Sequence, residues 1–145
     1  MGKWYARGQS YDSVFGDISS SYEECRAEAV GIYLSLESYI LEIFGYETPK
    51  EQGDVTYVNW FSMALSGLRG LESYSVDANK WLQAHSQARY VILRVLLETA
   101  PDLVTIKETV DSEDQKPDLL VTLNRQVHFV EVLYGTWMNF KWRHY

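Results

Sequence analysis

Apolar residues recur three and four positions apart in three long stretches of the chain, and this spacing is typical of α-helices that bury one face. The stretches cover residues 20–44, 55–72 and 78–99. Gly45 can end the first helix, and Pro101 cannot continue the third. We therefore expect a mainly α fold that is built from three substantial packed helices.

Polar residues that favour helix starts precede the second and third stretches. Thr48, Pro49 and Glu51 have the order of a capping residue, a first-turn proline and a capping-box partner. Asp77 is suited to cap the third helix. The second helix should therefore start beside Thr48, and the third beside residue 78.

Two glycines interrupt the apolar pattern of the second helix. Gly67 and Gly70 each lower its intrinsic stability by up to about 1 kcal/mol. Glycine within a packed helix permits an unusually close approach of a neighbouring backbone. We expect both positions to mark contact with a neighbour.

The periodicity changes after the third helix. The segments LVTI at 103–106 and LLVTL at 119–123 are short and contain several β-branched residues. The polar stretch KETVDSEDQKPD lies between them. This pattern predicts a short β element, either a hairpin or a pair of strands, near the C-terminus.

Composition argues against several classes of partner. The 145 residues suit one domain, and acidic side chains outnumber basic ones by 20 to 13, giving a net charge of −7. Nucleic-acid binding needs clustered Lys and Arg, so we expect no such partner. Apolar runs such as residues 90–97 are too short to span a membrane. Cys25 is the only cysteine, which favours a reducing, cytoplasmic location.

A dense group of charges lies within the segment SSYEECRAEAVGIYL at 20–34. Glu24 and Glu28 are four apart, so they project from the same side of a helix although like charges repel. One interpretation is a helix start in which Ser20 or Ser21 is the cap and an early glutamate completes a capping box. The other is that the carboxylates surround a cation, a metal or a metal-bound histidine. Spacing alone does not choose between them.

A second group lies in the segment QAHSQAR of the third helix. His85 and Arg89 are four apart, beside an apolar stripe. A single helical histidine is by default a structural group, and an arginine at this spacing can be a solvated neighbour. Asp12 lies further upstream, where it can cap a first helix.

The chain resembles the catalytic segment of the dipeptidyl peptidase III family. The similarity runs in order over residues 4–125 and includes GQSYDSVFGDI, EECRAE, LEIFGYE, DVTYVNW, WLQAHSQARYVILRVLLE and LVTI. EECRAE is a specific signature of that family. The resemblance implies a cytosolic zinc peptidase that removes dipeptides from the N-termini of short peptides. It also implies that the fold is part of a larger, zincin-like catalytic lobe.

The resemblance implies a zinc ligand on the first helix. In the family, zinc is bound by two histidines of a HEXXGH motif and by one carboxylate of EECRAE. Glu24 matches that carboxylate, while Glu23 and Glu28 match the side chains that orient the histidine ligands. A His2Glu set leaves one position for water, and the glutamate of HEXXGH acts as general base.

The resemblance also implies substrate-binding roles outside EECRAE. His85 and Arg89 match cleft residues that hold the substrate and the developing oxyanion, so we expect His85 to donate a hydrogen bond to the tetrahedral intermediate. Asp12 matches a carboxylate beside the N-terminal subsites. The alternatives remain open that His85 is a structural group, that Arg89 is solvated and that Asp12 caps a helix.

The sequence departs from the family pattern in two ways. It contains no HEXXGH, and its three histidines, at positions 85, 128 and 144, form no zinc-binding pair. In the family this motif lies upstream of EECRAE, in a protein several times longer with a second lobe. We therefore expect residues 1–125 to be a partial catalytic region, inactive alone, and residues 126–145 to be a divergent, aromatic-rich tail.

Two hypotheses follow. The chain is either a fragment of a zinc dipeptidyl peptidase, with the remainder of the catalytic lobe and the second lobe as its partners, or a truncated, non-catalytic helical module that binds peptides or proteins. Zinc and an upstream HEXXGH in the same transcript would distinguish the first hypothesis from the second.

Overall fold

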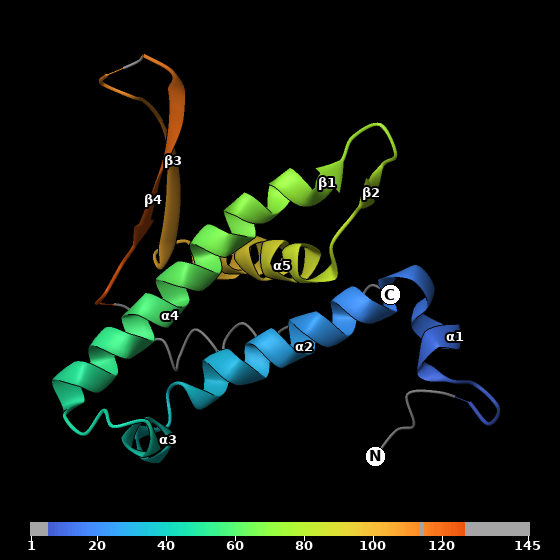
Figure 1. Cartoon of the computed structure of the whole chain (residues 1–145), viewed down its shortest axis with the longest axis horizontal. Helices are drawn as coiled ribbons and strands as arrows, with labels where there is room; N and C mark the ends of the chain where they lie inside the picture. The colour runs from blue at the N-terminus through green and yellow to red at the C-terminus, as the bar shows by residue number, and fades with distance from the viewer. Residues whose placement is uncertain (1–5, 114, 127–145) are drawn as a thin grey trace.

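Three helices form the body of the molecule. The computed structural model describes residues 6–113 and 115–126, and its substantial helices are α2 (Ser19–Leu34), α4 (Pro49–Arg69) and α5 (Ala84–Thr99). α5 packs extensively against both α2 and α4 (Figure 1). The predicted fold of three substantial packed helices is confirmed.

Shorter elements connect the helices and follow them. They are α1 (Tyr11–Phe15), the 3-10 helices η1 (Gly16–Ile18) and η2 (Gly70–Ser73), α3 (Ser38–Ile43), and the strands β1 (Tyr74–Ser75), β2 (Lys80–Trp81), β3 (Val104–Val110) and β4 (Pro117–Leu123). The strands form two separate antiparallel pairs, β1 with β2 and β3 with β4.

The start of α4 has the predicted capping box. The Thr48 hydroxyl accepts a hydrogen bond from the Glu51 backbone N–H at 3.3 Å, and the Glu51 carboxylate accepts one from the Thr48 N–H at 3.0 Å. Pro49 occupies the first helical position, where no N–H is needed. Local sequence therefore fixes this helix start.

The predicted continuous helix over 20–44 is wrong, because α2 ends at Leu34 and α3 begins at Ser38. The carbonyl of Ser35 accepts a hydrogen bond from the Thr56 hydroxyl of α4 at 3.1 Å. The backbone at Glu37 is extended, with φ −86° and ψ 112°. A tertiary contact and an extended residue thus replace the helical bonds that the apolar pattern favours.

The start of α2 also differs from the expectation. The helix begins at Ser19, and Ile18 occupies the cap position without a side-chain hydrogen bond. Ser21 is buried and donates its hydroxyl proton to the Ile18 carbonyl at 3.2 Å. Neither Ser20 nor Ser21 is therefore the cap. The preceding η1 continues directly into α2, so no separate cap is required.

The third helix starts six residues later than expected, at Ala84. The segment before it is a tight turn in which Tyr74 pairs with Trp81 and the Tyr74 hydroxyl donates to the Asn79 side chain at 2.5 Å. Asn79 has a positive φ of 49°, which asparagine tolerates. Asp77 is part of this turn, and Gln83 caps α5 instead.

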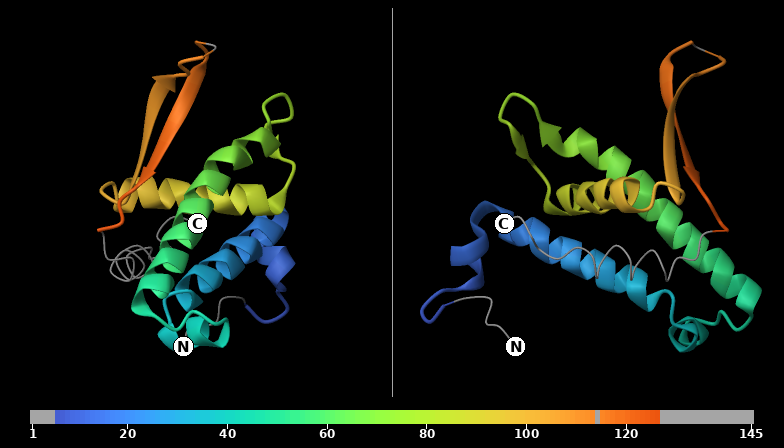
Figure 2. Two further views of the ribbon diagram at one scale, coloured as in Figure 1. Left: turned by 60° about the vertical axis from the view of Figure 1, so that its left-hand side comes forward. Right: turned by 180° about the vertical axis from the view of Figure 1, so that it is seen from behind.

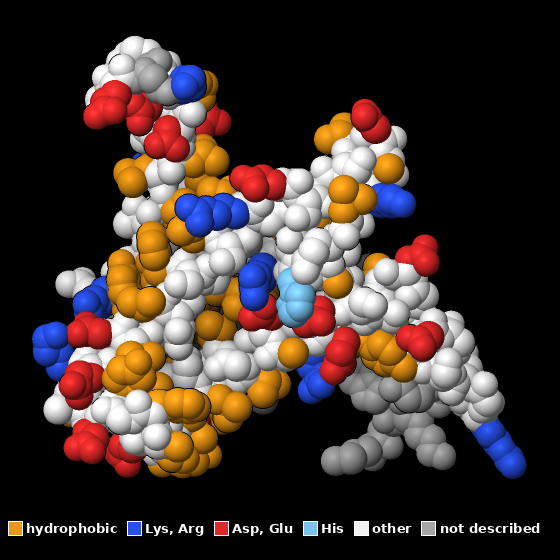
Figure 3. All heavy atoms as spheres, viewed as in Figure 1, with side chains coloured by type: hydrophobic (Ala, Val, Ile, Leu, Met, Phe, Trp, Pro, Cys, Tyr) orange, Lys and Arg blue, Asp and Glu red, His pale blue; other side chains and the backbone are white. Residues whose placement is uncertain are grey.

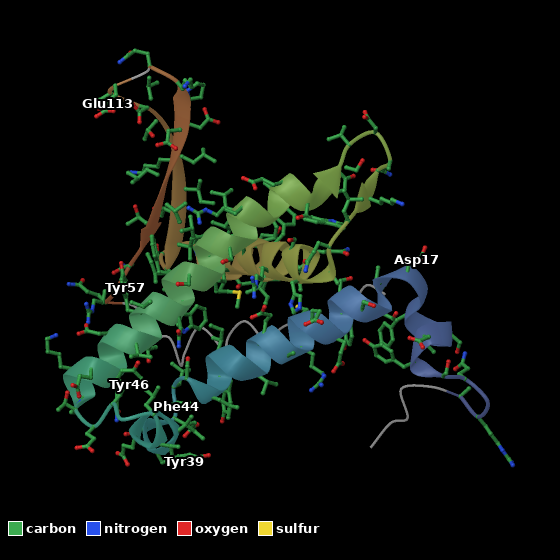
Figure 4. All side chains as sticks on the ribbon, in the orientation of Figure 1. Asp17, Tyr39, Phe44, Tyr46, Tyr57 and Glu113 are labelled. Carbon is green, nitrogen blue, oxygen red and sulfur yellow. The ribbon has the colours of Figure 1, made fainter. Side chains whose placement is uncertain are left out.

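The predicted β element is present as a hairpin of two seven-residue strands. Val104 lies opposite Leu123, and Val110 lies opposite Pro117. The hairpin projects from the helical body in all three ribbon views (Figures 1 and 2), and Glu113 lies at its tip (Figure 4). At its base, Arg125 pairs with Asp54 of α4.

The core lies where α2, α4, α5 and the base of the hairpin meet. Within the described part of the chain it consists of Ile32, Trp60, Met63, Ala64, Leu93, Leu96, Leu103, Val104 and Leu123. The hairpin is thus anchored at its base. By contrast, the side chains of Ile43 and Phe44 at the end of α3 are about three-quarters exposed. Across residues 6–113 and 115–126, no helix combines the length and apolarity that a membrane span requires.

Candidate functional site

The carboxylates of α2 face the polar side of α5. The two helices lie side by side in the views of Figures 1 and 2. Glu24 and Glu28 project from α2 toward His85 and Arg89, which project from the first turns of α5. The prediction that the two glutamates share one face is confirmed, since both contact His85.

Distances within this four-residue cluster are short. His85 Nδ1 lies 3.1 Å from Glu24 Oε2 and 3.7 Å from Glu28 Oε1. Arg89 Nε donates a hydrogen bond to Glu28 Oε1 at 2.7 Å, and Arg89 Nη2 forms an ion pair with the same oxygen, also at 2.7 Å. The Glu28 side chain is only 18% exposed, against 32% for Glu24. The less exposed carboxylate is therefore the one that pairs with the permanently charged arginine.

The cluster balances charges that would otherwise repel. Two like charges four apart on one helix are unfavourable, and a cation between or beside them offsets this. In Figure 3 a histidine side chain lies on the surface beside acidic and basic side chains, where α2 and α5 meet. The site is therefore reachable from solvent on one side.

Glu23 lies outside the cluster. Its carboxylate forms an i, i+3 ion pair with Arg26, and the Glu23 side chain is 49% exposed. The hydrogen bond from Arg26 lowers the pKa of Glu23 below its ordinary value. The structure thus brings Glu24 and Glu28 to His85 but leaves Glu23 with a different partner.

Asp12 lies on α1, at the N-terminal end of α2. The cap of α1 is Ser10, whose hydroxyl accepts from the Ser13 N–H, so Asp12 is exposed in the first turn and is not the cap. Rings of Tyr11, Phe15 and Tyr22 hold α1 against α2. Among the described residues, no ion pair joins Asp12 to the four-residue cluster.

Comparison with known proteins gives the context of this site. A sequence model described as peptidase family M49 matches residues 1–129, most of the chain. The chain belongs to this family. It is 55% identical over 122 residues to the dipeptidyl peptidase 3 of Nematostella vectensis and of Homo sapiens, and 46% identical over 125 residues to that of Dictyostelium discoideum.

The M49 relatives are much longer than this chain. The matches to the Nematostella and human proteins cover 84% of the chain and 16% of each relative, and the match to the Dictyostelium protein covers 83% and 17%. The chain therefore spans about one sixth of the length of these relatives. The expected resemblance to dipeptidyl peptidase III is confirmed. The expected tail at 126–145 lies, apart from Gln126, outside the described residues.

Metal-ligating groups of this M49 chain are few. Across residues 6–113 and 115–126, no three His, Cys, Asp or Glu side chains are placed to hold one metal ion. Glu24 contacts His85 through Oε2, and its Oε1 has no hydrogen bond or ion pair to a described residue. The cluster can thus supply a ligand to a metal, but it does not form a complete metal site.

Cys25 lies between the two glutamates in the sequence but has a different environment. Its thiol is partly buried. Burial is the larger cause, and the nearby charge of Glu28 the smaller cause, of a thiol pKa above the ordinary value. A raised pKa keeps the thiol protonated at neutral pH and weakens it as a nucleophile. Cys25 therefore behaves as a small packing residue.

Sequence reasoning missed how α5 begins beside this site. The Gln83 side chain accepts a hydrogen bond from the Ser86 N–H at 2.6 Å, and the Ser86 hydroxyl donates to Ser73 Oγ at 3.1 Å. These bonds hold the turn that carries His85. A polar residue three positions before Ser86 was the available signal, although Asp77 offered a more typical cap.

Proposed function

We propose that the chain is part of a zinc-dependent dipeptidyl peptidase that releases N-terminal dipeptides from short peptides. The supporting observation is the contact of Glu24 and Glu28 of α2 with His85 and Arg89 of α5. It occurs in a member of peptidase family M49 whose relatives are called dipeptidyl peptidase 3. The remainder of the catalytic lobe and the second lobe are then its structural partners, and the cytoplasm is its location.

The chemistry of Glu24 fits one ligand position of a zinc site. The Glu24 side chain is about two-thirds buried, and carboxylate oxygen is a ligand that zinc accepts. The described part of the chain contains no group of three His, Cys, Asp or Glu side chains that could complete the site. The histidine ligands therefore come from a HEXXGH motif that this sequence lacks.

Neighbouring carboxylates would orient those histidines. Both bonds from Arg89 and the contact from His85 engage Oε1 of Glu28, so its Oε2 can accept a ligand N–H. Glu23 can accept another if its carboxylate also keeps Arg26. Such bonds fix the ring orientation and raise the basicity of a ligand histidine. Zinc, when bound, polarises the scissile carbonyl and acidifies water.

Side chains of α5 and α1 would act on the peptide. His85 is held through Nδ1 by Glu24, which directs Nε2 away for a hydrogen bond to the oxygen of the tetrahedral intermediate. Arg89, fixed by Glu28, adds a positive charge next to that oxygen. Asp12 is exposed and unpaired with the cluster, which suits the cationic N-terminus of a peptide.

A chimera tests this function. The matching segment of human dipeptidyl peptidase 3 is replaced by residues 4–125 of this chain, and dipeptide release is measured with a chromogenic dipeptidyl substrate. We expect the chimera to be active and the isolated chain to be inactive. His85→Ala should lower kcat by about 100-fold, the usual effect of removing one oxyanion donor.

Glu98→Gln is the matched control, because Glu98 is an exposed partner of Arg94 on the same helix. It should leave kcat and KM unchanged. Dipeptide release by the isolated chain would contradict the assignment of the chain as an incomplete site. Full activity of the His85→Ala chimera would contradict the role of His85. A folded, zinc-free chain that binds a peptide saturably would instead favour the non-catalytic module.

A further inference from the structure

α5 is held between two different surfaces. Its side toward α2 carries His85 and Arg89, which meet the glutamates of that helix. Its side toward α4 carries the backbone of Ser86 and Arg89 and the side chain of Leu93, which meet two glycines. α5 therefore contacts α2 through charged side chains and α4 through closely packed backbone.

The two glycines lie against rigid parts of α5. A Cβ placed on Gly67 would lie 2.6 Å from the Arg89 carbonyl oxygen and 2.7 Å from Leu93 Cβ. A Cβ on Gly70 would lie 2.8 Å from the Ser86 carbonyl oxygen. Ordinary contacts begin at 3.4 Å, and these neighbours are backbone atoms or a Cβ, so no side-chain rotation relieves the overlap.

The contact is specific to this end of α4. Gly53 lies on the same helix, but a Cβ there would meet no described atom within 4 Å. Ala64 of α4 and Ala88 of α5 are also small and are 0% and 1% exposed. Both helices therefore carry a buried small residue within a turn of the glycine contacts.

We propose that Gly67 and Gly70 are positioning residues, which set the distance of His85 and Arg89 from the carboxylates of α2. Gly70 touches the residue next to His85, and Gly67 touches the backbone of Arg89 itself. An added methyl group at Gly67 would move α5 by most of an ångström relative to α4. The catalytic consequence of this movement rests on the function proposed above.

Arg89 provides a direct measure of this position in the full 145-residue chain. Its Nε–H donates to Glu28 Oε1 at 2.7 Å, and a hydrogen-bonded Nε proton exchanges slowly with water. Hydrogen exchange of this proton is measured by nuclear magnetic resonance in the parent and in Gly67→Ala, Gly70→Ala and Gly53→Ala. We expect exchange at least about tenfold faster in the first two variants and unchanged exchange in Gly53→Ala.

Backbone amide exchange in α4 and the hairpin reports whether each variant keeps its fold. If Gly67→Ala unfolds, Gly70→Ala carries the test, because its closest contact is longer. Unchanged Nε–H exchange in a folded glycine variant overturns the proposal. Global unfolding of both variants overturns it as well, because the glycines would then maintain the whole fold.

The chimera separates positioning from simple stability. We expect Gly67→Ala and Gly70→Ala to lower kcat by about 10- to 100-fold with KM within about twofold, because a shift near 1 Å misplaces a catalytic group. If kcat falls only in proportion to the fraction of folded protein, the proposal is overturned. An inactive parent chimera would contradict the proposed function alone, since the Arg89 exchange measurement does not require activity.

Discussion

At the scale of single residues, Glu28 links the two helices of the site. It is the least exposed carboxylate of the cluster, and Arg89 binds it through two nitrogens. Removing its charge would leave the Arg89 guanidinium without a full acceptor. Glu28 is largely shielded from solvent, but the Arg89 side chain is 39% exposed. Solvent screening therefore limits what this ion pair contributes to stability.

Glu28→Gln should lower the free energy of unfolding by about 1 kcal/mol in urea denaturation at neutral pH. Glu98→Gln breaks an i, i+4 pair whose side chains are both more than half exposed. Its effect should stay below about 0.5 kcal/mol. Equal effects of the two variants would show that burial of Glu28 adds nothing to the pair.

Cys25 should react slowly with iodoacetamide at pH 7.5, compared with cysteine in an unstructured peptide. Burial and the charge of Glu28 raise the pKa of the thiol, so the reactive thiolate is scarce. The rate of alkylation should rise only when the pH exceeds the ordinary thiol pKa. A rate equal to that of the free peptide would contradict the burial of Cys25.

Sequence spacing predicted part of this site and missed another part. The i, i+4 spacing correctly placed Glu24 and Glu28 on one face. The i, i+3 spacing of Glu23 and Arg26 permits the ion pair that the structure shows, but spacing alone does not say which neighbouring acid Arg26 selects. The contact of His85 with α2 was likewise beyond spacing, since it joins residues 61 positions apart.

At the scale of elements, the sequence predicted a helix end correctly where residues next to that end form all of its capping bonds. The start of α4 needed only Thr48, Pro49 and Glu51, and all three act as predicted. The break after α2 depends on Thr56 of α4, whose hydroxyl donates a hydrogen bond to the Ser35 carbonyl. The turn before α5 depends on Tyr74 and Asn79. Helix ends that rest on tertiary contacts were therefore missed.

Thr48→Ala should lower the free energy of unfolding by about 1 kcal/mol at neutral pH, because it removes a capping box. Ser20→Ala is the control, since Ser20 makes no capping bond and should change stability by less than about 0.5 kcal/mol. Equal destabilisation by the two variants in urea denaturation would contradict the described start of α2.

The Thr48 effect should also depend on pH. Hydrogen bonds from Thr48 hold the pKa of Glu51 below its ordinary value of 4.5. Stabilisation from the ionised carboxylate is present above that value and is lost as the pH falls through the lowered pKa. The difference between Thr48→Ala and the parent should therefore shrink in acid. A constant difference would assign the effect to the bond that the Thr48 hydroxyl accepts from the Glu51 N–H, which does not titrate.

At the scale of the whole molecule, α5 connects the core to the site. It packs on α4 through small residues and meets the glutamates of α2 on its other side. One helix thereby transmits the packing of the core to the proposed catalytic groups. The chain spans about one sixth of its M49 relatives, so we propose that its site works only beside ligands from the remaining sequence.

The central claim is that Glu24 is a zinc ligand, and the metal content of the chimera tests it most directly. The parent, Glu24→Gln and Glu98→Gln chimeras are dialysed against a weak chelator. The zinc that remains bound is then measured by inductively coupled plasma mass spectrometry. The parent and Glu98→Gln should retain about one zinc per molecule, while Glu24→Gln should lose most of it, because only two protein ligands would remain. Full retention of zinc by Glu24→Gln would contradict the claim.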